Sequence, residues 1–256
     1  MDKIITNMCK QVIKNFKHHK LGRCNVCGKI TIFLLATNIE QARGDFICIY
    51  CRSYSRKRHV AKIINELVSN TFSISQIPEK ANKIDIYNLD VGDAFYKTLY
   101  GMDSFVCSDF FPDKELGTEI EKGVFCQDLE KLTFPDESFD LVITEDVFEH
   151  VRNYEEGFMQ VSRVLKNGGY HLFTVPFIFD NFTIKRVGTS GNKDILILPP
   201  QYHESKRGKV LTYRTFGLDL FKFLDSIGFE TRVDFSRYSD QKYKIYDSFV
   251  FISKKL

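Results

Sequence analysis

Hydrophobic and polar positions follow their clearest pattern between residues 132 and 177. Residues 139–143 form a short, unbroken apolar run rich in β-branched side chains, which is typical of a strand buried on both faces of a parallel sheet. Apolar residues then recur at spacings of three and four from Phe158 to Leu165, which predicts the buried face of a helix. A second apolar run covers residues 170–175. This order predicts a β-α-β unit with parallel strands and a right-handed crossover.

The end residues of this helix predict its limits. Asn153 is a favourable N-cap, and Glu156 stands three positions later, where the acid of a capping box belongs. Lys166 suits the last turn of the helix, and Gly168-Gly169 predicts its end.

Weaker patterns predict the rest of the chain. Three further strands are expected over residues 83–89, 104–107 and 123–126. Thr215 is expected to cap a last helix that stops at Gly228, and residues 229–235 and 247–253 to form a closing antiparallel pair. At the other end, an amphipathic helix is expected within residues 1–20 and a polar linker over residues 69–82.

Composition limits the class of protein. Apolar residues make up 43% of the 256 residues, which is enough for a packed core, and the net charge is only +3. No apolar run approaches the roughly 20 residues of a membrane span, and the first 20 residues are too charged for a signal peptide. Seven cysteines, an odd number, favour thiols or metal ligands in a reducing compartment. We therefore expect a soluble, cytoplasmic protein.

Four of the cysteines form two C-x-x-C pairs. Cys24 and Cys27 are separated by twenty residues from Cys48 and Cys51. Each pair brings two sulfurs to one side of a tight turn, and two such turns can close a tetrahedral shell around Zn²⁺. Four thiolates leave no open position, so the sequence predicts a structural zinc ribbon whose folding depends on the metal. A redox C-x-x-C motif and two incidental pairs are the alternatives.

Basic residues follow the second pair of cysteines. Residues 52–59 read RSYSRKRH and lead into an amphipathic stretch. This cluster could bind the phosphates of a nucleic acid or of a phosphorylated acceptor. It could equally be a solvated helix start, or arginines that fasten the ribbon to the next domain. His18 and His19, which precede the ribbon, are interpreted as a solvated helix end rather than metal ligands.

The segment from FPDESFDLVITEDVFEHV to RVLKNGGYHLFTVPF resembles the fourth and fifth strands of class I S-adenosylmethionine (SAM)-dependent methyltransferases of the type 11 group. The resemblance implies a Rossmann-like α/β sheet behind the N-terminal zinc ribbon, with domains at residues 1–70 and 71–256. A zinc ribbon followed by such a domain is similar to a bacterial group associated with surface-glycan genes. This implies a SAM-dependent methyltransferase, and a small molecule or glycan as its acceptor.

The resemblance also assigns cofactor-binding positions at the strand ends. Asp109, with Phe110 beside it, is implied to hold the ribose, and Asp128 with Leu129 to hold the adenine. Leu89 ends the first strand, and Asp90 and Gly92 stand in the loop after it. Thr144 and Glu145 end the fourth strand, near the methionine part of SAM. The carboxyl edge of a parallel sheet is where such a fold binds its ligand. The first of these loops departs from the family pattern, because it has a single glycine where several are usual.

Residues 177–213 form an insertion after the fifth strand, on the side where the acceptor is expected. An oxygen nucleophile must lose a proton during methyl transfer, and a histidine is suited to accept it. His203, with Tyr202 beside it, is the first candidate for this base. His150 is a second candidate, although it is interpreted as part of the scaffold.

Three functions remain open at this level. O-methylation of a sugar or glycan precursor is preferred. The first alternative is an RNA or DNA methyltransferase that uses the ribbon and residues 52–59 to bind nucleic acid. The second is a non-catalytic binding module, which the glycine-poor loop suggests.

Overall fold

The structure is a computed structural model, and it describes residues 13–14, 16–35, 45–79, 83–189, 191, 193–205, 208–235 and 239–256. The chain divides into two compact units. The N-terminal unit gathers Met1–Ile84, Asp90–Phe105 and Val233–Val250, and the sheet unit gathers Asp85–Leu89, Val106–Arg232 and Phe251–Leu256. The predicted domains 1–70 and 71–256 stay a prediction. Among the described residues, no helix combines the length and apolar character needed to cross a membrane.

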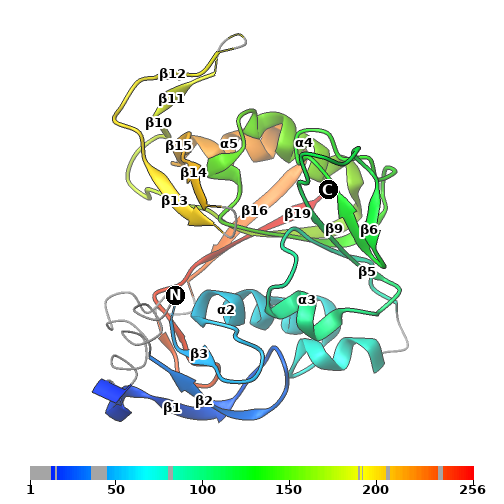
Figure 1. Ribbon diagram of the computed structural model, residues 1–256, viewed down its shortest axis with the longest axis vertical. Coiled ribbons are helices and arrows are strands. Elements are labelled where there is room, and N and C mark those ends of the chain that lie inside the picture. Colours follow the sequence, from blue (N-terminus) through cyan, green and yellow to red (C-terminus); the bar gives the residue numbers. More distant parts are fainter. Residues whose placement is uncertain are drawn as a thin grey trace. The chain divides into compact units, whose positions relative to one another are not determined.

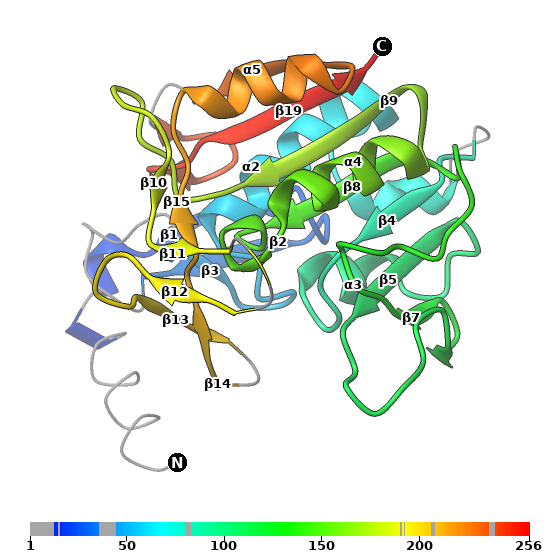
Figure 2. The ribbon, with the colours of Figure 1, turned by 90° about the horizontal axis from the view of Figure 1, so that it is seen from above.

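A mixed sheet is the main feature of the sheet unit. Over the described residues it has eight strands in the order β16-β19-β9-β8-β4-β5-β7-β6 (Figures 1 and 2). The pairs β4–β8, β8–β9 and β5–β7 are parallel, whereas β6 and β19 pair antiparallel with β7 and β9. The bounds are β4 (Ile86–Asn88), β5 (Phe105–Asp109), β6 (Glu119–Glu121), β7 (Val124–Cys126), β8 (Phe139–Glu145), β9 (Leu165–Thr174), β16 (Phe229–Asp234) and β19 (Val250–Lys255).

The predicted β-α-β unit is confirmed as β8, helix α4 (Tyr154–Val164) and β9. The Asn153 side chain caps α4 by accepting a hydrogen bond from the Glu156 N–H. The predicted end of the helix is wrong, because α4 stops at Val164 and residues 165–169 already belong to β9. Gly168 (φ 78°) lies where the register between β8 and β9 shifts, so it serves a strand irregularity rather than a helix end.

Helices α4 and α5 (Asp219–Ser226) pack together over β9 (Figure 2). Phe158 of α4 stacks on Phe148 at 3.7 Å between ring centroids and meets Phe173 of β9 at 5.3 Å. Phe223 of α5 lies 6.2 Å from the same ring. The predicted cap at Thr215 is wrong, because that residue pairs in a short strand and α5 begins four residues later.

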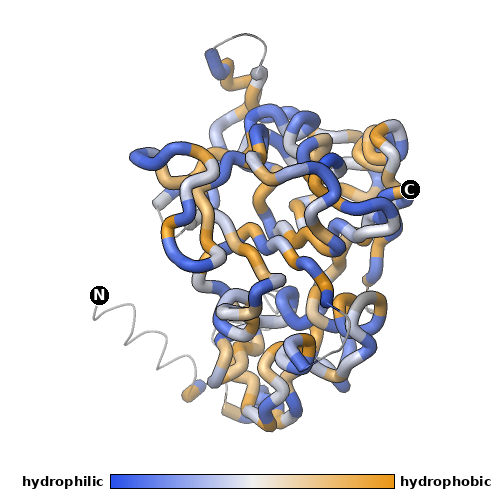
Figure 3. The backbone as a smooth tube through the Cα atoms, turned by 90° about the vertical axis from the view of Figure 1, so that its right-hand side faces the viewer, coloured by the Kyte–Doolittle hydropathy of each residue, from blue (hydrophilic) through white to orange (hydrophobic). Residues whose placement is uncertain are grey.

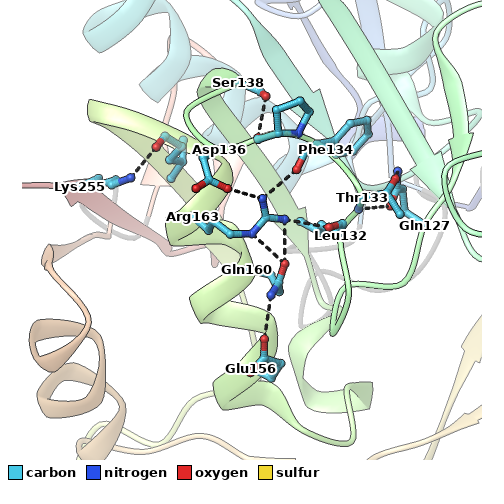
Figure 4. A network of polar contacts seen from close by, with 12 residues as sticks. Gln127, Leu132, Thr133, Phe134, Asp136, Ser138, Glu156, Gln160, Arg163 and Lys255 are labelled. Atoms are coloured by element: carbon cyan, nitrogen blue, oxygen red, sulfur yellow. Dashed lines mark hydrogen bonds and ion pairs between the residues drawn. The ribbon is translucent and has the colours of Figure 1, made fainter.

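Arg163 joins the carboxyl half of α4 to the loop before β8 (Figure 4). Its guanidinium donates to the carbonyl oxygens of Leu132 and Phe134, each at 2.8 Å, and to Asp136 at 2.7 Å. These bonds hold a loop that has no regular structure of its own, and they fix where β8 enters the sheet.

The insertion forms small antiparallel pairs, drawn in yellow and gold in Figure 1. Strand β10 (Ile184–Lys185) pairs with β15 (Arg214–Thr215), β11 (Val187–Gly188) with β12 (Ile195–Leu196), and β13 (Tyr202–Ser205) with β14 (Gly208–Leu211). Apolar side chains at residues 195–198 remain exposed, by 37% to 59%. The alternation of hydrophobic and hydrophilic stretches along the chain can be followed in Figure 3.

The N-terminal unit is built on a small sheet and helices. Its sheet contains β1 (Lys20–Arg23), β2 (Ile30–Leu34) and β3 (Ile47–Cys48), and its helices include α2 (Ser55–Ile64) and α3 (Ala94–Leu99). A π-helix, η3 (Asn65–Ser69), and a 3-10 helix, η4 (Ile74–Glu79), occupy much of the stretch predicted as a linker. That prediction is wrong at Ser73, which is buried and donates to the Val26 carbonyl. Strands β17 (Ser239–Asp240) and β18 (Ile245–Tyr246) form a hairpin, and most of the predicted N-terminal helix lies outside the described residues.

Candidate functional site

Two of the predicted acids lie side by side at the carboxyl edge of the sheet. Asp109 is the last residue of β5 and stands in register with Cys126, the last residue of β7. The Gln127 N–H donates to the Asp109 carbonyl at 3.1 Å, and Asp128 follows immediately. Because β5 and β7 are parallel, both carboxylates stand at the same edge.

Both acids hold their own turns, which fixes their orientation. The Asp109 carboxylate accepts from the Phe110 N–H at 2.8 Å, and the Asp128 carboxylate accepts from the Glu130 N–H at 2.9 Å. A carboxylate has two oxygens with about four acceptor sites in all, so it can accept several hydrogen bonds. The Phe110 ring is 48% exposed beside Asp109, whereas Leu129 is buried. Paired acceptors beside an exposed ring fit the hydroxyl-rich and aromatic parts of an adenosine.

The end of β8 contributes an acid and a strained turn. Glu145 is the last residue of β8, which is followed in the sheet order by β4 and then β5. Asp146 adopts a positive φ of 50°, and its carboxylate accepts from the Thr174 hydroxyl at 2.8 Å. Thr144 is buried, and its hydroxyl bonds to His171 at 2.8 Å, so this predicted cofactor residue contributes to core packing.

The glycine-poor loop begins where β4 leaves the sheet. The Leu89 N–H donates to the Ile143 carbonyl at 3.0 Å, which keeps Leu89 beside β8. Asp90 and Gly92 belong to the N-terminal unit, and Gly92 adopts a φ of 82° that favours glycine. Asp93 then caps α3 by accepting from the Tyr96 N–H, and it forms a buried ion pair with Lys57 at 2.6 Å.

The insertion and the turn after β8 bring together a glutamate and two histidines. The turn is the 3-10 helix η5 (Phe148–His150), and His203 comes from β13. The His203 Nδ1 and His150 Nε2 atoms are 3.2 Å apart. Glu149 Oε1 lies 3.6 Å from that His203 atom and 3.8 Å from that His150 atom. We call these three residues the Glu-His-His cluster.

A backbone framework from the end of the insertion holds this cluster. The His150 Nδ1 atom lies 2.8 Å from the Leu211 carbonyl, which can only accept, so this nitrogen carries the proton. The Tyr213 N–H donates to the Glu149 carbonyl at 2.8 Å. Arg214, which is 4% exposed, donates to the carbonyl oxygens of Phe148, Val151 and Arg152. Burial lowers the pKa of the Arg214 guanidinium to about 10, which leaves it charged at neutral pH.

Glu149 is the buried acid of the cluster. Its side chain is 0% exposed, and neither carboxylate oxygen has a hydrogen-bond partner. An isolated carboxylate is costly to bury, so the two histidines beside it, or a cation between the three groups, must offset its charge. His203 is 33% exposed and His150 is 16% exposed, so the cluster opens to solvent on the histidine side.

The four predicted zinc ligands come together in the N-terminal unit. The Sγ atoms of Cys24 and Cys51 are 3.8 Å apart, and those of Cys27 and Cys48 are 3.9 Å apart. A tetrahedral shell with Zn–S bonds of about 2.3 Å has S···S edges of about 3.8 Å, so the arrangement fits Zn²⁺. Hydrogen bonds from Cys27, and also from Cys51, lower the pKa of Cys24 to about 6, and bonds from the other three thiols lower the pKa of Cys48. Hydrogen bonds with Cys24 and Cys48, together with burial, raise the pKa of Cys27 and of Cys51.

Three residues of the basic cluster are buried, and one of them, Arg58, lies beside the cysteines. Lys57, Arg58 and His59 are at most 1% exposed. Arg58 donates to the carbonyl oxygens of Ser53, Tyr243 and Lys244 at 2.7 to 3.0 Å. Burial lowers the pKa of Arg58 to about 10, although the thiolates of the cluster act to raise it. The guanidinium therefore supplies positive charge next to a group of thiolates and fastens α2 to the hairpin β17–β18.

Comparison with known families identifies the domain. Residues 94–173 match the type 11 methyltransferase family, described as a methyltransferase domain. The match covers less than half of the chain. No curated protein matches the chain in sequence.

Solved structures give weak likenesses. A SAM-dependent methyltransferase of Mesorhizobium loti is 13% identical with a TM-score of 0.42, covering 71% of this chain and 98% of that one. One from Methanosarcina mazei is 15% identical with a TM-score of 0.38, covering 70% and 96%. A protein of Pyrococcus horikoshii is 16% identical with a TM-score of 0.43, covering 81% and 94%. Likeness at this level says nothing of the acceptor.

The matched domain establishes the general class. The chain carries a methyltransferase domain on a Rossmann-like sheet, and it is an enzyme of the SAM-dependent methyltransferase class. Sequence reasoning missed the roles of Glu149 and Arg214. The Glu149-His150 pair was visible in the sequence, but the burial of one and the contact of the other with His203 depend on the fold of the insertion.

Proposed function

We propose that the enzyme transfers the methyl group of SAM to a hydroxyl oxygen of a sugar or glycan precursor. The observation that carries the proposal is the Glu-His-His cluster, which joins the turn after β8 to the acceptor-side insertion. A hydroxyl acceptor needs a group to take its proton, and this cluster offers histidines next to a buried carboxylate.

SAM, when bound, supplies an electrophilic methyl group. Asp109 and Asp128 would hold the adenosine part at the carboxyl edge of the sheet, with Phe110 beside it and Glu145 nearer the reacting end. His203 would take the proton that the acceptor oxygen loses as its new bond to the methyl carbon forms. Glu149, 3.6 Å away, would stabilise the resulting positive charge in a poorly solvated setting. Tyr202, which is 53% exposed, is proposed as an acceptor contact.

The four cysteines are proposed to bind a structural Zn²⁺. Their spacing supports a closed tetrahedral shell without a position for substrate. A metal-held N-terminal unit would also steady Asp93 at the start of α3, because Lys57 of α2 is its ion-pair partner.

A nucleic-acid acceptor receives less support. Lys57, Arg58 and His59 make up three of the five charged or basic positions in residues 52–59, and all three are buried. Arg58 donates to carbonyl groups and Lys57 forms an ion pair with Asp93, so these buried side chains are not available to phosphates. The contacts of Arg58 favour the other interpretation of the basic cluster, in which it fastens the ribbon to another segment, here the hairpin β17–β18.

Titration calorimetry with SAM tests the cofactor site. We expect one site per chain, and Asp109→Asn or Asp128→Asn should weaken binding about tenfold or more, because each removes a charged acceptor. Asp113→Asn, at an exposed acid of the neighbouring loop, is the matched control and should bind as the wild type does. Equal affinity in all three variants would contradict the assignment.

A screen with labelled SAM tests the acceptor. Nucleotide sugars, oligosaccharides and RNA would be offered to zinc-replete enzyme at two salt concentrations. Label in a sugar hydroxyl is the expected result. Label in RNA alone, with retention on RNA that falls steeply with salt, would replace the proposal with the nucleic-acid function.

A further inference from the structure

We propose that the Glu-His-His cluster is a binding site for a divalent transition-metal ion, distinct from the four-cysteine cluster. One ligand atom comes from each of Glu149, His150 and His203. Two of the ligands are neighbours in η5, and the third reaches them from β13, fifty-three residues later.

The spacing of the three donor atoms fits one ion. They are 3.2, 3.6 and 3.8 Å apart. A point equidistant from all three lies about 2.1 Å from each, close to the usual length of bonds from Zn²⁺ to imidazole nitrogen and carboxylate oxygen. A small outward shift of the ion from this plane leaves room for further ligands on one side.

The supporting contacts are those that a metal-binding histidine needs. The His150 Nδ1–H faces the Leu211 carbonyl at 2.8 Å, so the lone pair of Nε2 points into the cluster. Metal-ligating histidines commonly donate their second nitrogen to a carbonyl in this way. Arg214 and the Tyr213 N–H hold the backbone of the same turn, which fixes the ligands before an ion arrives.

A bound ion also satisfies the buried carboxylate. When no ion is bound, the 3.2 Å contact between His203 Nδ1 and His150 Nε2 is a hydrogen bond made by a single proton. Glu149 then receives no hydrogen bond. With an ion, both nitrogen lone pairs and a carboxylate oxygen become ligands and the charge of Glu149 is neutralised. The wholly buried and unbonded state of this side chain therefore points to a cation.

The donor set selects the class of metal. Two imidazoles and one carboxylate suit Zn²⁺, Fe²⁺, Co²⁺ or Mn²⁺, whereas Mg²⁺ and Ca²⁺ prefer oxygen ligands. Three protein ligands leave open positions on the ion, and His203, which is 33% exposed, gives the cluster a side that is open to solvent. A hydroxyl bound there would lose its proton more readily. With an ion bound, the His203 Nδ1 lone pair is a ligand, so the ion would take over from His203 the task of promoting loss of the acceptor proton. This last role rests on the proposed function, whereas metal binding does not.

Cobalt titration of the full chain tests the site. Protein with one zinc per chain, established by elemental analysis, would be titrated with Co²⁺ and followed by visible absorption. We expect one saturable Co²⁺ per chain without the intense near-ultraviolet band of cobalt–thiolate bonds, which would report exchange into the cysteine site. Thermal unfolding should shift to higher temperature with Co²⁺.

Matched variants decide the ligands. Glu149→Gln and His203→Gln should each weaken Co²⁺ binding at least tenfold. His18→Gln removes a histidine of the N-terminal unit and should bind as the wild type does. Circular dichroism checks that each variant is folded, and a misfolded one is replaced by His203→Ala at the more exposed ligand.

Either of two results overturns the proposal. The first is wild-type protein that shows neither saturable Co²⁺ binding nor a thermal shift. The second is binding that is equal in the wild type and in both ligand variants, which would mean adventitious surface binding. If Co²⁺ binds as expected but no sugar hydroxyl is methylated, the metal site stands and the proposed function fails.

Discussion

The four-cysteine cluster and the Glu-His-His cluster use different routes to gather reactive side chains. Each cysteine pair lies within one tight turn, and the shell that the four sulfurs form has no open position. The Glu-His-His cluster draws on two segments fifty-three residues apart, it includes a carboxylate, and one of its histidines is 33% exposed. The first arrangement suits stability and the second suits chemistry.

The groups that offset the negative charge of the two clusters also differ. Arg58 is buried beside the thiolates and offsets their charge with a guanidinium that cannot leave. Beside Glu149 the partners are His150 and His203, whose ring nitrogens can bind a proton or a metal ion. A fixed counter-charge suits a permanent site, whereas nitrogen lone pairs suit a site that exchanges protons or ligands.

The largest effect is expected at the cysteines. Cys48→Ala should abolish zinc binding and unfold the N-terminal unit, because a structural zinc site contributes about 10–16 kcal/mol of apparent binding free energy to folding. Elemental analysis and thermal unfolding would measure this. Cys107→Ala, at a buried cysteine of β5 outside the cluster, is the control and should retain the metal. Zinc retained by Cys48→Ala would contradict the assignment of the four-cysteine cluster as a structural metal site.

Arg58 is expected to have the next largest effect. Arg58→Met should lower the free energy of unfolding by about 3–5 kcal/mol, because it removes a buried charge and leaves three carbonyl groups without their donor. Denaturant unfolding of zinc-loaded protein measures the change. Arg52→Lys, at an exposed position of the same segment, should change it by less than about 0.5 kcal/mol. Similar values for the two variants would mean that Arg58 is not the counter-charge.

Replacing His203 should change the rate of methyl transfer much more than the free energy of unfolding, the opposite of what is expected for Arg58. His203→Gln should lower methyl transfer by about 10²–10⁴-fold, the usual contribution of a proton-accepting group, while the free energy of unfolding changes by less than about 1 kcal/mol. Rates with labelled SAM and denaturant unfolding would be measured on the same samples, with His18→Gln as control. A large loss of stability without a matching loss of rate would make His203 a structural residue.

The smallest effect is expected at His171, a buried histidine of the sheet unit that lies outside the Glu-His-His cluster. Burial lowers the pKa of His171 to about 3 from its ordinary value of 6.5. Only the unfolded chain binds this proton readily, so the contribution to stability is complete above pH 6.5 and declines as pH falls toward 3. At pH 5 the loss is about 2 kcal/mol. His171→Gln should weaken this acid dependence in denaturant unfolding measured from pH 7 to pH 5, and an unchanged dependence would contradict the assignment.

Local patterns were sufficient where the determining residues are close in sequence. The strands at the sheet centre, the Asn153 cap and the two cysteine pairs are each set by a few neighbouring residues, and the structure contains all of them. The strand-end positions of Asp109 and Asp128 followed from the same local patterns together with the family resemblance.

Tertiary packing decided what such patterns could not. Gly168 permits either a helix end or a strand irregularity, and pairing of β9 with β8 selected the latter. The basic character of residues 52–59 did not show that Arg58 is buried, because its three acceptors come partly from a hairpin nearly two hundred residues later. The meeting of His203 with Glu149 likewise depends on how the insertion folds back over η5. A sequence determines the conformations that neighbouring residues favour, but the burial of a charge and its partner are settled only when distant segments pack.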